Sequence, residues 1–226
     1  VGGDTREMSL LMGTSGSLGR LFAGASLNKR GMIFTRNQIG GDVRGVSSFG
    51  NNYARLNSSG GATGAFVAVP GYACADGDFY NTSPGTATNQ CSFNFNASAA
   101  NEAAIGNKSL FVNGEFNVND DWTIYSSVSA SNIDSFGRYA ATPVSVTLAP
   151  TSPAYLAITG ATPGLAAASP NGLALRHRMA AAGSRDTSTD ALVSSFMGGT
   201  RGTIFGDVNV DAGVRFEKYK YTELGR

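Results

Sequence analysis

The sequence has few charged residues and little material for metal or acid–base chemistry. Charged residues make up 15% of the 226 residues and the formal net charge is +1, so the chain lacks the basic stripe of nucleic-acid binders. One histidine and two cysteines are too few soft ligands for a zinc site. No run of about 18 apolar residues occurs, which excludes a transmembrane helix. We therefore expect no nucleic-acid partner, no metal, no cofactor and no catalytic residue.

Apolar residues at helical spacing are missing too, and period-2 alternation takes their place. Glycine is abundant, at 30 residues. Residues 108–131 place Leu110 and Val112 on one face of a first strand. Asp120 lies in a polar turn, and Ile124 falls on the matching face of the return strand. This pattern predicts a β-hairpin with one apolar and one polar face.

Other stretches with the same alternation predict further strands. Residues 7–14 and 20–30 are expected to form a second hairpin, with the charges of residues 20–30 on the face opposite the aliphatic side chains. Residues 191–198 predict a weaker strand. Residues 208–217 predict a clean last strand, in which valines alternate with charged and polar residues.

Two long stretches, at about residues 40–106 and 134–186, show no periodicity, and prolines in the second block regular structure. Connections thus run short, long, short, long, short. Transmembrane β-barrels separate short periplasmic turns from long extracellular loops in this way. We expect an all-β fold: an antiparallel up-and-down meander of about six strands within a larger transmembrane β-barrel, with two long external loops. Residues 1–226 are expected to form a single unit, an internal piece of a longer polypeptide.

The two cysteines, Cys74 and Cys91, lie in one polar segment with 16 residues between them. A disulfide closing a loop of that size removes roughly 3 kcal/mol of chain entropy from the unfolded state. We predict this disulfide, which implies an oxidising compartment such as the periplasm or cell surface. In a reducing compartment the pair would be coincidental.

Aromatic and cationic side chains in the long stretches are the candidate ligand contacts. Aromatic residues offer large contact areas at low entropic cost, and an Arg-His-Arg run would attract an anionic ligand. Two alternatives stay open: the aromatics form a small core within the loop, and the cations are a solvated charge run. The candidates are Phe66, Tyr72, Phe79, Tyr80, Arg176, His177 and Arg178.

Six short stretches, taken in order, carry a resemblance to a known family. They are residues 91–95, 107–114, 170–172, 176–178, 183–185 and 198–202. Together they resemble loop and strand segments in the β-barrel portion of TonB-dependent outer-membrane receptors. The family's plug domain, its short N-terminal box for the energising partner and its remaining strands have no counterpart in this sequence.

The resemblance implies part of a receptor in the bacterial cell outer membrane that takes up a scarce ligand of siderophore, cobalamin or glycan class by binding and energised translocation. Its partners would be outer-membrane lipid, the remainder of its own barrel and plug domain, a TonB-type energising protein and the small-molecule ligand. The resemblance also implies that the chain is not an enzyme. The alternative is a secreted β-sandwich or adhesin-type binding domain, whose alternating faces pack sheet on sheet. A diffusion porin shares the wall pattern, and a secreted hydrolase would need an acid–base constellation that the sequence lacks.

Overall fold

The computed structural model describes residues 2–38, 40, 44–71, 74 and 77–225. The chain divides into two compact units where the sequence had suggested one. The first unit comprises Val1–Ile33, Glu102–Gly137 and Asp186–Arg226, and the second comprises Phe34–Asn101 and Arg138–Arg185. The second unit is therefore made of the two stretches that were expected to be irregular connections.

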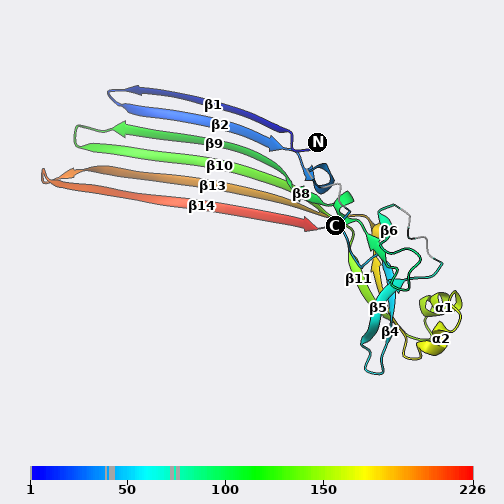
Figure 1. Ribbon diagram of the computed structural model, residues 1–226. Coiled ribbons are helices and arrows are strands. Elements are labelled where there is room, and N and C mark those ends of the chain that lie inside the picture. Colours follow the sequence, from blue (N-terminus) through cyan, green and yellow to red (C-terminus); the bar gives the residue numbers. More distant parts are fainter. Residues whose placement is uncertain (1, 39, 41–43, 72–73, 75–76, 226) are drawn as a thin grey trace. The chain divides into compact units, whose positions relative to one another are not determined.

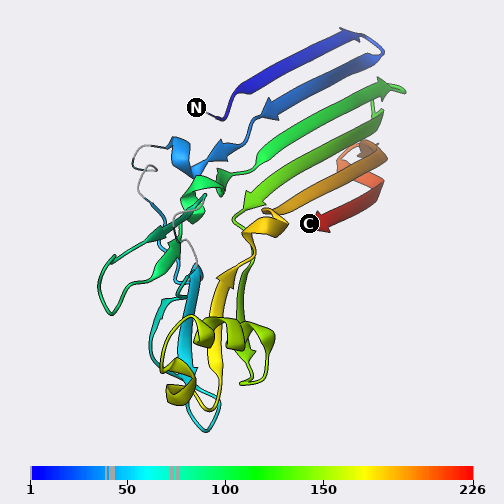
Figure 2. The same cartoon turned by 90° about the vertical axis from the view of Figure 1, so that its right-hand side faces the viewer.

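The first unit is built on one six-stranded sheet in the order β1-β2-β9-β10-β13-β14. Neighbours in the sheet follow one another along the unit's chain, so the sheet is an up-and-down meander in a single layer (Figures 1 and 2). This confirms the all-β fold and the antiparallel hairpins. The strands are β1 (Thr5–Gly16), β2 (Gly19–Arg30), β9 (Ala104–Asn117), β10 (Trp122–Tyr139), β13 (Arg185–Ile204) and β14 (Val208–Gly225).

The last hairpin is much longer than its hydrophobic pattern indicated. Strands β13 and β14 have 20 and 18 residues, and their pairing runs from Ile204 and Val208 to Thr187 and Gly225. Backbone hydrogen bonds continue the ladder through lysines, tyrosines and threonines that carry no apolar alternation. The connecting turn has φ of 56° at Phe205 and a positive φ at the following glycine, as in the mirror-image turns that match the twist of paired strands.

Most large aliphatic side chains of the sheet lie on one face and are exposed, although Leu11 on β1 lies on the opposite face. Pairing places Leu110 beside Ala25 on β2 and Ala130 on β10. The exposed fraction is 50% for Leu110 and 58% for Val214. The described residues of the first unit form no second layer of secondary structure that packs on these side chains.

The opposite face of the sheet holds a network of charged and polar side chains. Arg20 donates two hydrogen bonds to the Glu115 carboxylate, at 2.8 and 2.9 Å, and Arg201 donates a third at 2.9 Å. The Tyr125 hydroxyl donates to Asp211 at 2.6 Å. These contacts link five of the six strands across one face, so the two faces differ in chemistry as the alternation predicted. One charge of residues 20–30 departs from the prediction, because Lys29 is two residues from Leu27 and therefore shares the aliphatic face.

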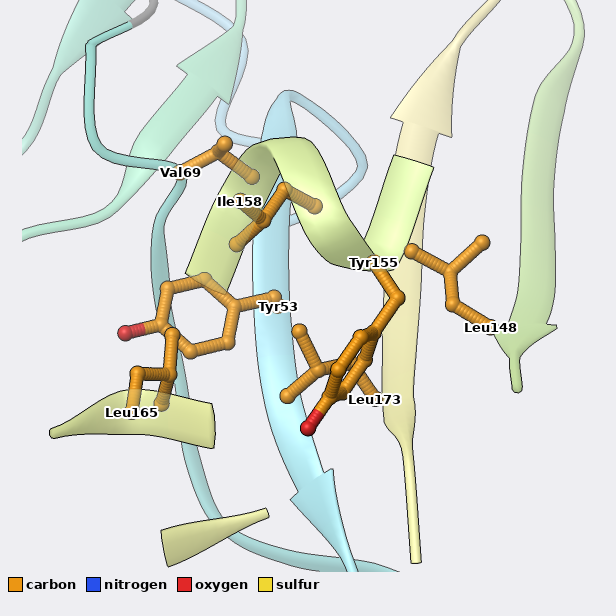
Figure 3. Packing of buried hydrophobic residues seen from close by; sticks show 7 residues of the cluster. All are labelled: Tyr53, Val69, Leu148, Tyr155, Ile158, Leu165 and Leu173. Carbon is orange, nitrogen blue, oxygen red and sulfur yellow. The ribbon is translucent and has the colours of Figure 1, made fainter. Parts of the chain in front are cut away.

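The second unit has its own sheet and its own core. Its four-stranded sheet has the order β11-β12-β4-β5. Two helices pack on this sheet, and a buried hydrophobic cluster lies between the sheet and the helices (Figure 3). The cluster consists of Tyr53, Val69, Leu148, Tyr155, Ile158, Leu165 and Leu173. The strands and helices are β4 (Asn51–Leu56), β5 (Ala62–Ala68), β11 (Pro143–Leu148), β12 (Leu173–Arg178), α1 (Pro153–Gly160) and α2 (Leu165–Ala168).

Short elements complete the chain. The short strands pair as two further two-stranded sheets, β3 with β8 and β6 with β7. Their bounds are β3 (Ile33–Phe34), β6 (Phe79–Asn81), β7 (Cys91–Phe93) and β8 (Ala100–Glu102), and the 3-10 turns are η1 (Thr35–Asn37), η2 (Phe95–Ala97) and η3 (Ala180–Ala182). Among the described residues, no helix is long and apolar enough to cross a membrane.

Prolines start elements in the second unit, which explains why its structure was missed. Pro153 is the first residue of α1, where a missing N–H costs nothing, and the Ser152 side chain accepts from the Tyr155 amide as the N-cap. Pro143 begins the edge strand β11, a position that proline tolerates. The sheet itself pairs β12 with β4, so each long stretch supplies only part of it.

Replacing Leu173 by alanine tests whether this core holds the second unit together. Leu173 is fully buried, so Leu173→Ala should lower the free energy of unfolding of the second unit by about 2–5 kcal/mol. The matched control is Leu156→Ala on α1, where the side chain is 57% exposed and the expected change is within about 0.5 kcal/mol. Denaturant unfolding of both variants measures the difference, and equal effects would contradict the assigned core.

Candidate functional site

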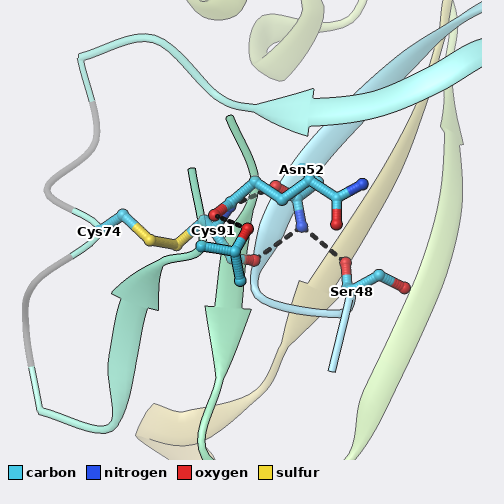
Figure 4. The surroundings of a disulfide bond; sticks show 6 residues. Ser48, Asn52, Cys74 and Cys91 are labelled. Atoms are coloured by element: carbon cyan, nitrogen blue, oxygen red, sulfur yellow. Dashed lines mark hydrogen bonds between the residues drawn. A yellow bond between two sulfur atoms is a disulfide. The ribbon is translucent and has the colours of Figure 1, made fainter. Parts of the chain in front are cut away.

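The disulfide predicted from the sequence is present. Cys74 and Cys91 are bonded with their Cα atoms 5.5 Å apart, and no cysteine among the described residues is free (Figure 4). The bond ties the connection after β5 to the start of β7. It thereby fixes one side of the aromatic cluster described below.

A buried asparagine holds the same strand from the other side. The side chain of Asn52, on β4, donates to the carbonyls of Ser48 and Cys91 at 2.6 and 2.7 Å and accepts from the Cys91 amide at 2.8 Å (Figure 4). A Cβ at Gly50 would lie 1.7 Å from the Cys91 carbonyl oxygen. Only glycine permits this approach of two backbones, and Asn52 then satisfies the polar groups that the approach buries.

Two arginines on one face of β12 lie over aromatic rings. Arg176 is 3.9 Å from the centre of the Phe66 ring. Arg178, two residues further along the same face, is 5.0 Å from the centre of the Phe93 ring. Phe79 meets Phe93 edge to face, with centroids 5.0 Å apart. Four of the predicted contact residues therefore take part in arginine–aromatic contacts: Arg176 with Phe66, and Arg178 with Phe79 through the Phe93 ring.

Arg178 is buried, so the solvated charge run is the wrong interpretation for this residue. Its guanidinium donates to the Ala141 carbonyl and the Ser47 hydroxyl, both at 2.7 Å. Burial, and secondarily the positive charge of Arg185, lower its pKa from the usual value. Among the described residues, nothing accepts a hydrogen bond from its Nε atom. A desolvated cation with a free donor favours the approach of an anion.

A cavity of about 510 Å³ opens beside this arginine. The Ser98 hydroxyl, a second buried polar group, has no partner within the described part of the chain. His177 half-buries its ring, and desolvation lowers its pKa, so Arg178 is the cation of the cavity at neutral pH. The walls include Asp78, Phe79, Phe93, Ser98, His177, Arg178 and Ser184.

The other predicted residues have structural contacts. The Tyr80 hydroxyl donates to the Gly45 carbonyl at 3.0 Å, and Arg44 lies over its ring at 5.0 Å. Arg176 also reaches the Ser48 hydroxyl at 3.1 Å. Tyr72 lies outside the described residues. The aromatics thus both stabilise the loop and line the cavity, and the two interpretations left open by the sequence apply to different residues.

Sequence reasoning passed over several residues on which the site depends. Phe93 lay in the aromatic-rich stretch but was not chosen, although its ring contacts both Phe79 and Arg178. Ser98 and Asn52 carry no motif. Their signal is burial of a polar group, which becomes visible only when β4, β7 and β12 are brought together.

The cavity walls combine the Arg178 guanidinium with the Asp78 carboxylate, the Ser98 and Ser184 hydroxyls and the rings of Phe79 and Phe93. The desolvated guanidinium and the two rings suit a ligand that has an anionic group on a partly apolar frame and a hydrogen-bond donor for the Asp78 carboxylate. Comparisons with protein-family models, with curated proteins and with solved structures find no match for this chain.

Removing the disulfide tests its role in holding the site. The paired variant Cys74→Ser/Cys91→Ser should lower the free energy of unfolding of the second unit by about 3 kcal/mol, because the open chain regains loop entropy. Adding reductant should shift the wild-type unfolding transition equally and leave the variant unchanged. A shift below about 1 kcal/mol would show that Asn52 and the sheet hold β7 without the bond.

The pH dependence of stability tests whether the His177 ring is buried in the folded state. Because its pKa is lower in the folded state, the unfolded chain binds more protons, so the stability contribution is present above the unfolded pKa of about 6.5 and is lost as pH falls below it. His177→Gln should remove this component. The measurement is the difference in unfolding midpoint between wild type and variant from about pH 7.5 to about pH 5. Parallel curves would contradict the prediction.

Proposed function

We propose that this chain is a wall segment of an outer-membrane receptor barrel of the TonB-dependent kind, and that its second unit contacts a ligand outside the membrane. The observation that carries the proposal is the six-stranded meander whose aliphatic face is exposed while its other face holds ion pairs. In a barrel wall the aliphatic face meets lipid and the charged face meets an aqueous interior.

The length of the aliphatic band supports this assignment. On β14, Val208, Val210, Val214 and Phe216 alternate with polar residues across nine positions. At about 3.3 Å per residue this is roughly 27 Å along the strand. With the strand tilt of about 35–45° found in barrels, the band is about 20 Å tall, close to the roughly 25 Å of an outer-membrane wall.

The hairpins are also staggered as barrel closure requires. Gly16, Gly19, Phe116 and Ile124 are successive partners across four strands, so the first hairpin turns at this level. The second hairpin continues to Val118 and Trp122, whose backbones are still hydrogen-bonded. The third reaches further still, because Thr203 donates to the Asp121 carbonyl within the second turn. A constant step in one direction corresponds to the strand tilt of a closed sheet.

An aromatic residue lies at the short-turn end of the aliphatic face. A Cβ at Gly202 would lie 2.4 Å from the Trp122 ring, so the indole packs flat on a glycine of the next strand. Tryptophan at this level suits the aromatic girdle of a barrel. The edge strands β1 and β14 each have one unpaired side within the described sheet, where the remaining strands of a barrel would pair.

The arginine–aromatic cavity gives the second unit a role as a ligand-screening element. Its buried Arg178 and the unpartnered Ser98 hydroxyl favour a ligand with an anionic group. Admission of the ligand would then be energised through parts of the receptor outside this chain. The alternative, a secreted β-sandwich or adhesin domain, needs a second layer against the aliphatic face.

Spin labels on adjacent residues test the membrane assignment. Nitroxides at Val112→Cys and Val128→Cys should be reached by oxygen, which concentrates in acyl chains, after reconstitution of the intact protein into vesicles. The matched labels at Asn113→Cys and Ser127→Cys, one residue away on the opposite face, should be reached by a water-soluble nickel complex instead. A sandwich would leave the valine labels immobilised and inaccessible to both reagents.

A further inference from the structure

The cavity beside Arg178 contains two opposite charges that are not paired with each other. Of the described residues that line it, Asp78 is the only one with a carboxylate and Arg178 the only one with a guanidinium. No ion pair between described residues involves either group. The Asp78 carbonyl accepts from the Asn94 amide at 2.8 Å, which holds this residue at the cavity wall.

Two aromatic rings connect these charges along the cavity wall. The Arg178 guanidinium is 5.0 Å from the centre of the Phe93 ring, which is in turn 5.0 Å from the centre of the Phe79 ring. Phe79 and Phe93 are direct partners in the pairing of β6 with β7, so the backbone fixes the two rings side by side. Asp78 immediately precedes Phe79 in the chain. A positive end, an apolar middle and a negative end therefore follow one another.

A second arginine strengthens the positive end. Arg178 donates to the Ala141 carbonyl at 2.7 Å, and Arg185 donates to the neighbouring Ala140 carbonyl at 2.9 Å. After burial, repulsion from Arg185 is the second cause that lowers the pKa of Arg178. Asp186 follows Arg185 in the sequence but is not among the described residues that line the cavity. An anionic group bound at this end would relieve the repulsion between the two arginines.

The negative end restricts the ligand further. A purely anionic ligand gains attraction at Arg178 but meets repulsion at Asp78. A zwitterion gains at both ends, provided that an apolar part separates its charges and matches the rings. Two steps of 5.0 Å correspond to two or three extended residues at about 3.3–3.6 Å each. The cavity volume of about 510 Å³ lies within the range of about 300–1,000 Å³ for small-molecule sites.

Hydrogen-bonding groups in the walls suit the peptide unit. The Ser98 hydroxyl is buried without a partner among the described residues, and the Ser184 hydroxyl and the His177 ring also line the cavity. Ala141 and Ala180 add apolar surface to the wall. A peptide presents one N–H and one C=O per residue between its side chains, so it can use both kinds of surface.

We infer that this cavity binds a short peptide with free termini, its carboxylate at Arg178 and its ammonium group at Asp78. The peptide has two or three residues, and its apolar side chains contact the Phe79 and Phe93 rings. This inference rests on the proposed role of the second unit as a ligand-screening element. It names the chemical class of the ligand, which that role alone leaves open.

Isothermal titration calorimetry of the intact protein in detergent tests the inference with the dipeptide Phe-Ala and the tripeptide Ala-Phe-Ala. Each peptide is compared with its N-acetylated form, which lacks the ammonium group, and with its C-terminal amide, which lacks the carboxylate. Either modification should raise the dissociation constant at least about tenfold. This factor corresponds to about 1.4 kcal/mol, close to the lower end for a hydrogen bond to a charged group.

Two substitutions assign the ends of the peptide. Asp78→Asn should abolish the discrimination against the N-acetylated peptide and keep that against the amide, and Arg178→Gln should do the reverse. Because Arg178 is buried, the unfolding midpoint of Arg178→Gln is measured as well; if this variant does not fold, Asp78→Asn and the modified peptides still decide. The matched control Arg55→Gln removes an exposed charge on β4 and should keep both discriminations.

Failure of the peptide site and failure of the barrel give different results. If neither peptide binds, or if the N-acetylated forms bind as tightly as the free peptides, the peptide site is wrong, whereas a Val112 label in lipid still supports the barrel. Discriminations that survive both substitutions in folded protein would also overturn the site. If the peptides bind as expected but the Val112 label is shielded from lipid, the barrel is wrong and the cavity keeps its ligand class.

Discussion

The structure depends on where each of the two units places its apolar side chains, either in a buried core or on an exposed face. In the second unit, two helices cover a four-stranded sheet, and residues such as Leu173 and Ile158 are buried between them. In the first unit, aliphatic residues of equal size, such as Leu110 and Val214, are exposed. The same chain therefore buries its apolar residues in a core in the second unit and leaves residues of similar size exposed in the first. The described residues of the first unit place no second layer on the aliphatic face of the long sheet.

The sheet pattern was predictable because it is local, whereas the second unit was not. Alternation in residues 108–131 and 208–217 is legible one strand at a time, and pairing confirmed both. In contrast, β12 pairs with β4, more than a hundred residues away in sequence. Pro143 and Pro153 look like breakers in isolation but begin a strand and a helix. Long-range pairing through short strands leaves no period in a sequence that is rich in glycine and serine.

The candidate site shows the same division. The disulfide and the residues Phe66, Phe79 and Arg178 were predictable from residue type, since cysteines, aromatics and arginines have few roles in a polar stretch. Ser98 and Asn52 were not predictable, because their importance comes from burial. The buried Ser98 hydroxyl has no hydrogen-bond partner among the described residues, whereas the buried Asn52 side chain is hydrogen-bonded. The chemistry of Arg178 also changes with context: over Phe93 and away from solvent it is a desolvated cation, whereas the sequence places it in a simple charge run.

Positive charges of the described residues occur in two contrasting settings, and each has a different counter-group. On the charged face of the sheet, Arg20 and Arg201 share the Glu115 carboxylate. In the second unit, Arg178 lies over an aromatic ring with carbonyl and hydroxyl acceptors.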